Sequence, residues 1–256
     1  ITTAAGLNNG FDPSSTLTGS NVITLPDTVT ELTNYANQKC NGQDSVTLQT
    51  AFALSCNTAF VEMSEQIGAD ELRKYAKAFG VGENYDLGVS TSGGTLGDLP
   101  DGAATAQSAI GQRDVTMTAL QAAVMAGTVA NKGTRMQPYL VNRITDAQMK
   151  DVRTTKPKKA DQAVNEETAA TLTDLMYASE RSSWGYDGNG FASKTGTAEH
   201  GEGLAPHVWY VAFDPERDIA VGVVVKNGGT LGESATGGKV SGPIGRAILR
   251  AYQGEQ

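Results

Sequence analysis

The sequence predicts an α+β fold in which an antiparallel sheet is flanked by helices. Segments whose apolar residues recur at helical spacing come before and after one compact group of strand-like segments near the C-terminus. Two of those strand-like segments are joined by a short turn, as in a β-hairpin. The chain has 256 residues, of which 39% are apolar, and this is enough to bury a full core. It contains no repeat that would indicate a solenoid.

The N-terminal half is predicted to be mainly helical. Residues 1–7 have a helix-like apolar pattern, and the same spacing recurs from Thr47 to Gly68. The segment Ser55-Cys56-Asn57 interrupts the second pattern, because Ser and Asn prefer caps and turns to helix interiors. A further helix is expected from Ala69 to Phe79, before a glycine that suits a C-cap. Residues 81–102 are rich in Gly, Asp, Ser and Thr and are expected to form a loop.

The C-terminal half is predicted to contain the sheet. Helices are expected from about Thr116 to Asn131 and from Asn165 onward, where an apolar stripe follows a capping residue. Residues 208–213 and 219–225 are rich in β-branched and aromatic residues, and a turn-like segment separates them. Residues 243–252 are expected to form a last helix, with proline in its first turn.

Composition excludes several classes of ligand. The 28 acidic residues outnumber the 20 basic ones, and a net charge of −8 argues against nucleic acid as a partner. The basic cluster Lys156-Pro157-Lys158-Lys159 is most simply a solvated loop. The only histidines, His200 and His207, have no cysteine or carboxylate at ligand spacing, so neither a metal site nor a cofactor is expected. No apolar run reaches the roughly 20 residues of a membrane-spanning helix.

The segment from Phe191 to Gly201 places a lysine, two threonines and a glycine directly before the predicted hairpin. A glycine inside a strand marks a bulge, or a place where a ligand or another backbone approaches closely. Lys194, Thr195 and Thr197 would be presented to such a ligand. Lys-Thr-Gly alone arises easily by chance, so an exposed strand lysine is an equally simple interpretation.

The two cysteines, Cys40 and Cys56, leave two possibilities open. If paired, they would close a loop of about 15 residues, which the chain-entropy treatment values at roughly 3 kcal/mol. Two cysteines in a chain of this length do not by themselves distinguish a disulfide from two free thiols.

Three features follow one another in a fixed order. Ser55-x-Asn57 stands at the helix break, Gly-Gln-Arg-Asp (residues 111–114) precedes a long helix, and Lys194-Thr-Gly-Thr enters a hairpin that carries His207-Val-Trp. Together they resemble the transpeptidase domain of the penicillin-binding proteins, most of all the class B enzymes of the actinobacterial type. The resemblance covers essentially the whole chain and implies one domain, residues 1–256, with the fold shared by penicillin-binding proteins and serine β-lactamases.

The resemblance implies roles for the residues at the helix break. In a site that transfers an acyl group from a D-alanyl-D-alanine amide, Ser55 would pass a proton between the family's lysine and the leaving amine. Asn57 would hold the peptide carbonyl of the substrate. Considered one at a time, both residues could instead be helix caps.

The Lys-Thr-Gly-Thr segment is implied to bind and polarise the substrate. Lys194 would keep the site positive and orient Ser55, and the hydroxyls of Thr195 and Thr197 would bind the terminal carboxylate. The backbone N–H of Thr197 would form half of the oxyanion hole. Gly196 would let the substrate strand lie close.

The resemblance also bears on the cysteines and on His207. Because a family member works in the oxidising cell envelope, a Cys40–Cys56 disulfide is expected, and it would fix the Ser55-Cys56-Asn57 turn. His207 matches the family's histidine at a strand start before tryptophan and is expected to be structural.

One departure from the family pattern is large. The family's nucleophile lies in Ser-x-x-Lys, and no serine of this chain is followed three places later by lysine. Residues 1–7 resemble the helix that directly follows that motif. The motif is therefore expected just upstream of Ile1, which would make residues 1–256 the larger, C-terminal part of a transpeptidase domain truncated at its N-terminal side.

The expected function is that of a D,D-transpeptidase, which cross-links peptidoglycan stem peptides and is acylated by β-lactams. A D,D-carboxypeptidase or a serine β-lactamase of the same fold stays an alternative, although no Glu-x-x-x-Asn loop is evident and Thr197 weakly favours the transpeptidase. A non-catalytic cell-division scaffold is a third. The expected location is the extracytoplasmic face of the cytoplasmic membrane, through an N-terminal anchor upstream, with cell-division and cell-wall synthesis proteins as partners.

Overall fold

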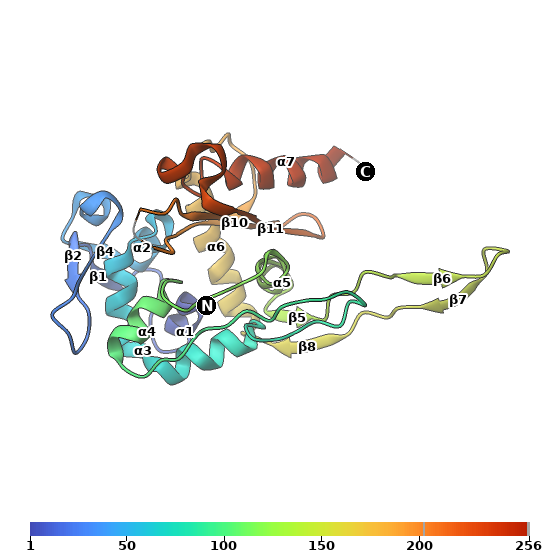
Figure 1. The fold of residues 1–256 in the computed structure, drawn as a ribbon, viewed down its shortest axis with the longest axis horizontal. Coiled ribbons are helices and arrows are strands. Elements are labelled where there is room, and N and C mark those ends of the chain that lie inside the picture. The colour runs from blue at the N-terminus through green and yellow to red at the C-terminus, as the bar shows by residue number, and fades with distance from the viewer. Residues whose placement is uncertain (202, 255–256) are drawn as a thin grey trace.

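The computed structural model describes residues 1–201 and 203–254, and it places helices around a small antiparallel sheet (Figure 1). The α-helices in chain order are α1 (Thr2–Leu7), α2 (Leu48–Leu54), α3 (Asn57–Ala78), α4 (Gly102–Ala109), α5 (Ala119–Ala130), α6 (Glu166–Ser182) and α7 (Ser241–Gly254). The strands are β1 (Thr16–Thr18), β2 (Val22–Thr24), β3 (Glu31–Thr33), β4 (Ser45–Thr47), β5 (Thr134–Met136), β6 (Arg143–Thr145), β7 (Asp151–Thr154), β8 (Lys159–Gln162), β9 (Ala192–Ala198), β10 (His207–Asp214) and β11 (Ile219–Val225). The predicted α+β class is confirmed.

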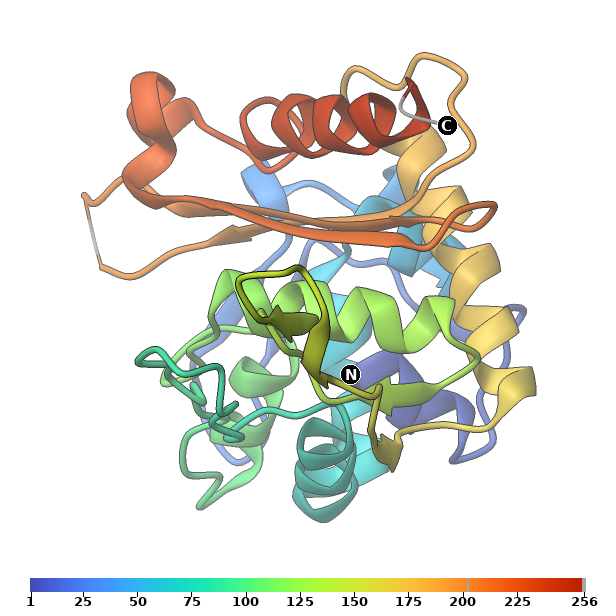
Figure 2. The same cartoon turned by 90° about the vertical axis from the view of Figure 1, so that its right-hand side faces the viewer.

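The largest sheet has three antiparallel strands in the order β11-β10-β9. Alternate residues of β10 are fully buried, as a strand between two packed layers requires. Helix α7 covers one face of the sheet and α5 the other (Figure 2). Strand β9 lies at the edge, so one side of its backbone is not used for pairing within the described residues. This free edge is the part of the sheet that matters for the site.

The main hydrophobic core lies between the inner face of the sheet and helices α1, α2, α3, α5 and α6. Helix α6 connects the two regions, because it packs against α2 on one side and against β9 on the other. Short two-stranded sheets, β1 with β4 and β2 with β3, border α2 and α3. None of the helices that the structure describes is long and apolar enough to cross a membrane.

Most predicted helices are present, with shifted boundaries. The break at Ser55-Cys56-Asn57 separates α2 from α3 as expected. The predicted helix from Ala69 is the second half of α3, which is broken at Gly68, where φ is +75° and ψ is +170°. Helix α5 begins later than predicted because Thr118 and Gln121 form a capping box that ends the preceding loop. Helix α4 was not predicted.

The region between α5 and α6 forms an arm. Strands β5 and β8 pair at its base, and β6 and β7 pair farther out, away from the rest of the molecule (Figure 1). The loop predicted for residues 156–159 is only partly correct, because Lys159 already belongs to β8. All residues of β7 and β8 are exposed, which explains why no apolar alternation marked them as strands.

Candidate active site

A cleft of about 920 Å³ opens between the helical part of the molecule and the free edge of β9. Ser55 and Asn57 line it from the α2–α3 junction, and Lys194, Thr195, Gly196 and Thr197 line it from β9. The structure thus brings into one cavity the two groups of site residues that the sequence places far apart. Their chemical roles stay predictions.

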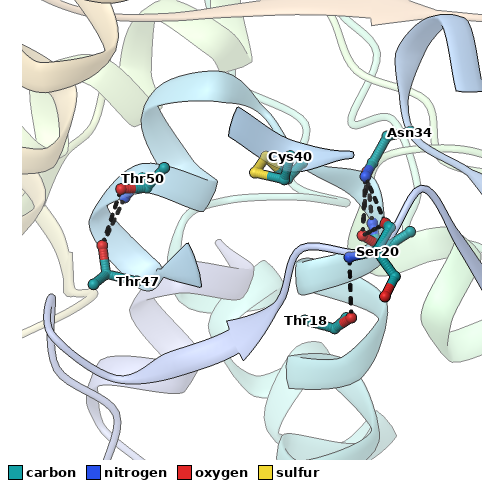
Figure 3. The surroundings of a disulfide bond; sticks show 8 residues. Thr18, Ser20, Asn34, Cys40, Thr47 and Thr50 are labelled. Carbon is teal, nitrogen blue, oxygen red and sulfur yellow. Dashed lines mark hydrogen bonds between the residues drawn. A yellow bond between two sulfur atoms is a disulfide. The ribbon is translucent and has the colours of Figure 1, made fainter. Parts of the chain in front are cut away.

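Ser55 lies in a sharp turn that the helix ends create. Thr47 caps the start of α2 by accepting a hydrogen bond from the backbone N–H of Thr50 at 3.2 Å (Figure 3). At the other end, Ser55 adopts φ +60° and ψ +49°, the left-handed conformation that commonly ends a helix. For a residue other than glycine this conformation costs roughly 1 to 2 kcal/mol. The turn leaves the side chain of Ser55 exposed to the cleft.

A buried disulfide constrains the residue that follows Ser55 in this turn. Cys56 directly precedes α3, is buried, and is bonded to Cys40 with a Cα–Cα distance of 5.7 Å, which is ordinary for a disulfide (Figure 3). Beside it, the side chain of Asn34 accepts a hydrogen bond from the backbone N–H of Thr58 at 3.0 Å and donates one to the carbonyl of Ser20 at 2.9 Å. The start of α3 is therefore fixed by covalent and polar contacts together.

Asn57 is oriented by strand β3. Its Nδ2 donates a hydrogen bond to the carbonyl oxygen of Thr33 at 3.0 Å. A side-chain amide has two N–H hydrogens. One bond to Thr33 therefore leaves a second donor for a carbonyl of a ligand in the cleft.

Two glycines lie where the β9 wall of the cleft is closely packed, Gly196 in β9 and Gly237 beside it. A side chain on Gly196 would bring a Cβ within 3.2 Å of Cβ of Trp209 on the neighbouring strand. A side chain on Gly237, in the segment before α7, would bring a Cβ within 2.6 Å of the carbonyl oxygen of Gly196.

The N–H of Gly237 donates a long hydrogen bond to Oγ1 of Thr197, at 3.4 Å. The hydroxyl hydrogen of Thr197 thus remains free to donate to an anion.

Lys194 gives the cleft a cation whose surroundings oppose its charge. The side chain is partly buried, its Nζ donates to the carbonyl of Thr195 at 3.0 Å, and it lies 5.9 Å from the ring centroid of Phe52. None of the ion pairs among the described residues includes it. Desolvation lowers the pKa of Lys194 to about 8. An anionic ligand would supply the missing counter-charge.

Sequence reasoning missed several lining residues, among them Tyr35, Thr236 and Arg113. The Gly-Gln-Arg-Asp segment carries the family resemblance, and its Arg113 also lines the cleft, with φ at +61° and a hydrogen bond from its guanidinium to the carbonyl of Asp98 at 2.8 Å. A charged residue inside a recognised segment was the available signal. No sequence signal marks Tyr35 or Thr236 as a site residue, because only the fold brings them to the cleft.

The histidines form a stacked pair beside the hairpin. The rings of His200 and His207 lie 3.9 Å apart at their centroids, and Nδ1 of His207 accepts a hydrogen bond from the backbone N–H of Asn227. Desolvation, with the nearby His200 and Lys226, lowers the pKa of His207. Within residues 1–201 and 203–254, no group of three or more metal-ligating side chains is found.

Comparison with known proteins identifies the class of protein that this fold and cleft define. The chain belongs to the penicillin-binding protein transpeptidase domain family, whose sequence profile matches residues 1–250. It is similar to peptidoglycan D,D-transpeptidase PbpA of Mycolicibacterium smegmatis, with 44% identity over 98% of this chain and 53% of that protein. PbpA of Mycobacterium tuberculosis is 42% identical over 100% of this chain and 54% of its own length. The chain therefore spans about half the length of the curated relatives it matches.

Solved structures give the same result. A ceftriaxone acyl-enzyme complex of penicillin-binding protein A from M. tuberculosis superposes with a TM-score of 0.93 and 40% identity, covering 98% of this chain and 58% of that one. The D,D-transpeptidase domain of a peptidoglycan glycosyltransferase from Eggerthella lenta has a TM-score of 0.83 at 23% identity over 100% of this chain and 64% of that one, which supports the fold alone. The expected penicillin-binding-protein fold is confirmed.

Proposed function

We propose that residues 1–256 form the larger, C-terminal part of the transpeptidase domain of a peptidoglycan D,D-transpeptidase. The observation that carries the proposal is the single cleft lined by Ser55, Asn57 and the β9 segment from Lys194 to Thr197. A concave site with converging polar groups and a perturbed amine is what acyl transfer requires. The names of the similar PbpA proteins, and the acyl-enzyme complex formed by one of them, support the same function.

The first half of the proposed reaction forms an acyl-enzyme. A serine in the Ser-x-x-Lys motif, proposed to precede Ile1, attacks the carbonyl carbon between the two D-alanines, and its proton is taken by the motif's lysine. Ser55 passes a proton to the leaving amine as the C–N bond breaks. Thr195 and Thr197 bind the terminal carboxylate beside Lys194, and the N–H of Thr197 stabilises the oxyanion. A β-lactam would follow the same path, but its leaving group stays attached.

The second half decides between the enzymatic alternatives. An amine of a second stem peptide attacks the acyl-enzyme, releases the serine and completes the cross-link. If water took the place of that amine, the protein would be a D,D-carboxypeptidase or a β-lactamase-like hydrolase. The names of the similar PbpA proteins favour the amine.

The proposed setting is the extracytoplasmic face of the cytoplasmic membrane. Transpeptidation needs stem peptides of the cell wall as both donor and acceptor, and the Cys40–Cys56 disulfide suits an oxidising compartment. Membrane attachment would come from a segment upstream of this chain. Cell-division and cell-wall synthesis proteins are the proposed protein partners.

Labelling with a fluorescent penicillin tests the proposal. The full-length protein should retain one label per molecule after denaturation, and alanine in place of the serine of the upstream Ser-x-x-Lys should abolish labelling. The chain Ile1–Gln256 alone should stay unlabelled. Stoichiometric labelling of that short chain would show that the nucleophile lies within it, and an unlabelled full-length protein would favour the non-catalytic scaffold.

A further inference from the structure

A buried carboxylate lies directly behind the β9 wall of the cleft. Glu180, in the last turns of α6, is 0% exposed and accepts hydrogen bonds from four side chains. Its Oε1 accepts from Nε of Arg246 at 2.6 Å and from Nδ2 of Asn189 at 2.9 Å. Its Oε2 accepts from the hydroxyl of Tyr210 at 3.0 Å and from the hydroxyl of Ser193. One carboxylate thus joins α6, α7, β9 and β10.

The surroundings keep this carboxylate charged. Desolvation raises the pKa of Glu180, but hydrogen bonds from Arg246, Ser193 and Asn189 outweigh it, so the pKa is lowered. Arg246 is itself 2% exposed and also donates to the carbonyl of Trp184 at 3.0 Å and to the hydroxyl of Ser183. Apolar residues could pack here as stably as a buried ion pair. The network is thus weak evidence for added stability, but it holds the elements that it joins in one geometry.

The geometry that it fixes is that of the active-site strand. Ser193 is 0% exposed and immediately precedes Lys194, so alternation along the strand turns Ser193 toward Glu180 and Lys194 toward the cleft. Tyr210 lies opposite Thr195 in the β9–β10 ladder. Because β9 is paired on one edge only, its further contacts come from helix α6 and from side chains such as Ser193.

We propose that Glu180 is a positioning residue: through Ser193 and Tyr210 it holds β9 so that Lys194 and the N–H of Thr197 stay in place for acyl transfer. The inference rests on the proposed function, since it assigns a task to the same cleft. Small misplacements of catalytic groups are costly, because a shift of about 1 Å can slow a reaction about a hundredfold.

Two substitutions in the full-length protein test the link. Ser193→Ala removes the connection to β9 but leaves Glu180 its bonds to Arg246, Asn189 and Tyr210, so the protein should fold. Glu180→Gln should turn its amide oxygen to Arg246 and its NH₂ to the hydroxyls of Ser193 and Tyr210, which can accept. Glu83→Gln is the matched control, because Glu83 pairs with the buried Arg135 at 2.6 Å and does not line the cleft.

Two measurements separate positioning from stability. Ser193→Ala should slow acylation by a fluorescent penicillin about tenfold or more, without weakening the initial non-covalent binding. Amide hydrogen exchange should rise in β9 while β11 keeps its protection. The Glu83→Gln control should acylate at the parent rate even if its melting temperature falls. In Glu180→Gln, acylation should slow less than in Ser193→Ala, because the amide can still bond to the hydroxyls of Ser193 and Tyr210.

The acylation rates and the hydrogen exchange of β9 test the positioning role and the anchoring of β9 separately. Ser193→Ala acylation within about twofold of the parent, or a loss of rate no larger than that caused by Glu83→Gln, overturns the positioning role. Unchanged exchange in β9 overturns the anchoring itself. An unlabelled parent protein would instead refute the proposed function, while hydrogen exchange would still decide whether Glu180 anchors β9.

Discussion

At the scale of single residues, folding disfavours the charged form of Lys194. Its pKa of about 8 in the folded protein lies below the ordinary value of 10.5, because the ammonium is partly desolvated. Between these two pH values the unfolded chain binds more protons than the folded one, so stability rises as the pH increases through this window. At neutral pH both states carry the proton and the full penalty is present. The proposed binding of an anionic ligand would supply the counter-charge that the fold does not provide.

Lys194→Met in the full-length protein should therefore separate function from stability. We expect the melting temperature at pH 7 to equal or exceed that of the parent, because a side chain of similar length replaces an ammonium without an acidic partner. This gain should shrink toward pH 10, where the parent loses the same charge. Acylation by a penicillin should fall on the order of a hundredfold or more. Thermal scans at both pH values and a labelling time course measure these effects; acylation near the parent rate would contradict the assigned role.

At the scale of elements, the turn between α2 and α3 that carries Ser55 depends on contacts with residues from other segments. Ser55 is held in a left-handed conformation, Cys56 is tied to Cys40, and Asn57 is bonded to Thr33. The disulfide connects the turn to the segment around Cys40, and the hydrogen bond of Asn57 connects it to strand β3. Such strain persists only where the surroundings fix it.

Replacing both Cys40 and Cys56 by alanine should lower the free energy of unfolding by about 3 kcal/mol, the value expected for a closed loop of this size. Chemical denaturation of the parent and the double variant, each with and without reductant, measures the change. Reductant should destabilise only the parent. A variant that is as stable as the oxidised parent would show that the bridge adds nothing to the fold.

At the scale of the whole molecule, the sheet lies between two helical layers that approach it unusually closely. A Cβ on Gly222 of β11 would lie 2.4 Å from the carbonyl oxygen of Ala119 in α5. On the other face, a Cβ on Gly245 of α7 would lie 2.2 Å from the ring of Tyr210. The glycines thus allow α5 and α7 to pack closely on the two faces of the sheet.

Gly222→Ala should accordingly destabilise the protein by roughly 1 to 3 kcal/mol, because the new methyl group has no space between β11 and α5. Gly127→Ala, on the same interface, is the matched control. Its Cβ would meet Cβ of Ala220 at 3.7 Å, an ordinary contact, and alanine favours a helix over glycine by about 1 kcal/mol. Denaturant midpoints should shift in opposite directions; equal shifts would contradict the close packing.

Local pattern was sufficient for elements whose amphipathic faces meet the core. The apolar stripe of α6 and the dense β-branched run of β11 could be predicted because burial selects those residue types. Helix α4 and the arm strands β6 and β7 were not predicted, because none of them shows a periodic apolar pattern. The first is short and made of small residues, and the others are exposed on both faces, so neither has a periodic contrast to detect.

The amino-acid sequence alone was enough to predict the ordered set of Ser-x-Asn and Lys-Thr-Gly-Thr, the helix break and the hairpin, because caps, turns and strand composition act over a few residues. The folded structure was needed to show that Ser55 and Lys194 share a cleft, that Arg113 lines it, and that Glu180 lies behind β9. These relations depend on how α6 packs between α2 and the sheet. Such long-range packing is the sum of many weak contacts, and no short segment of sequence encodes it.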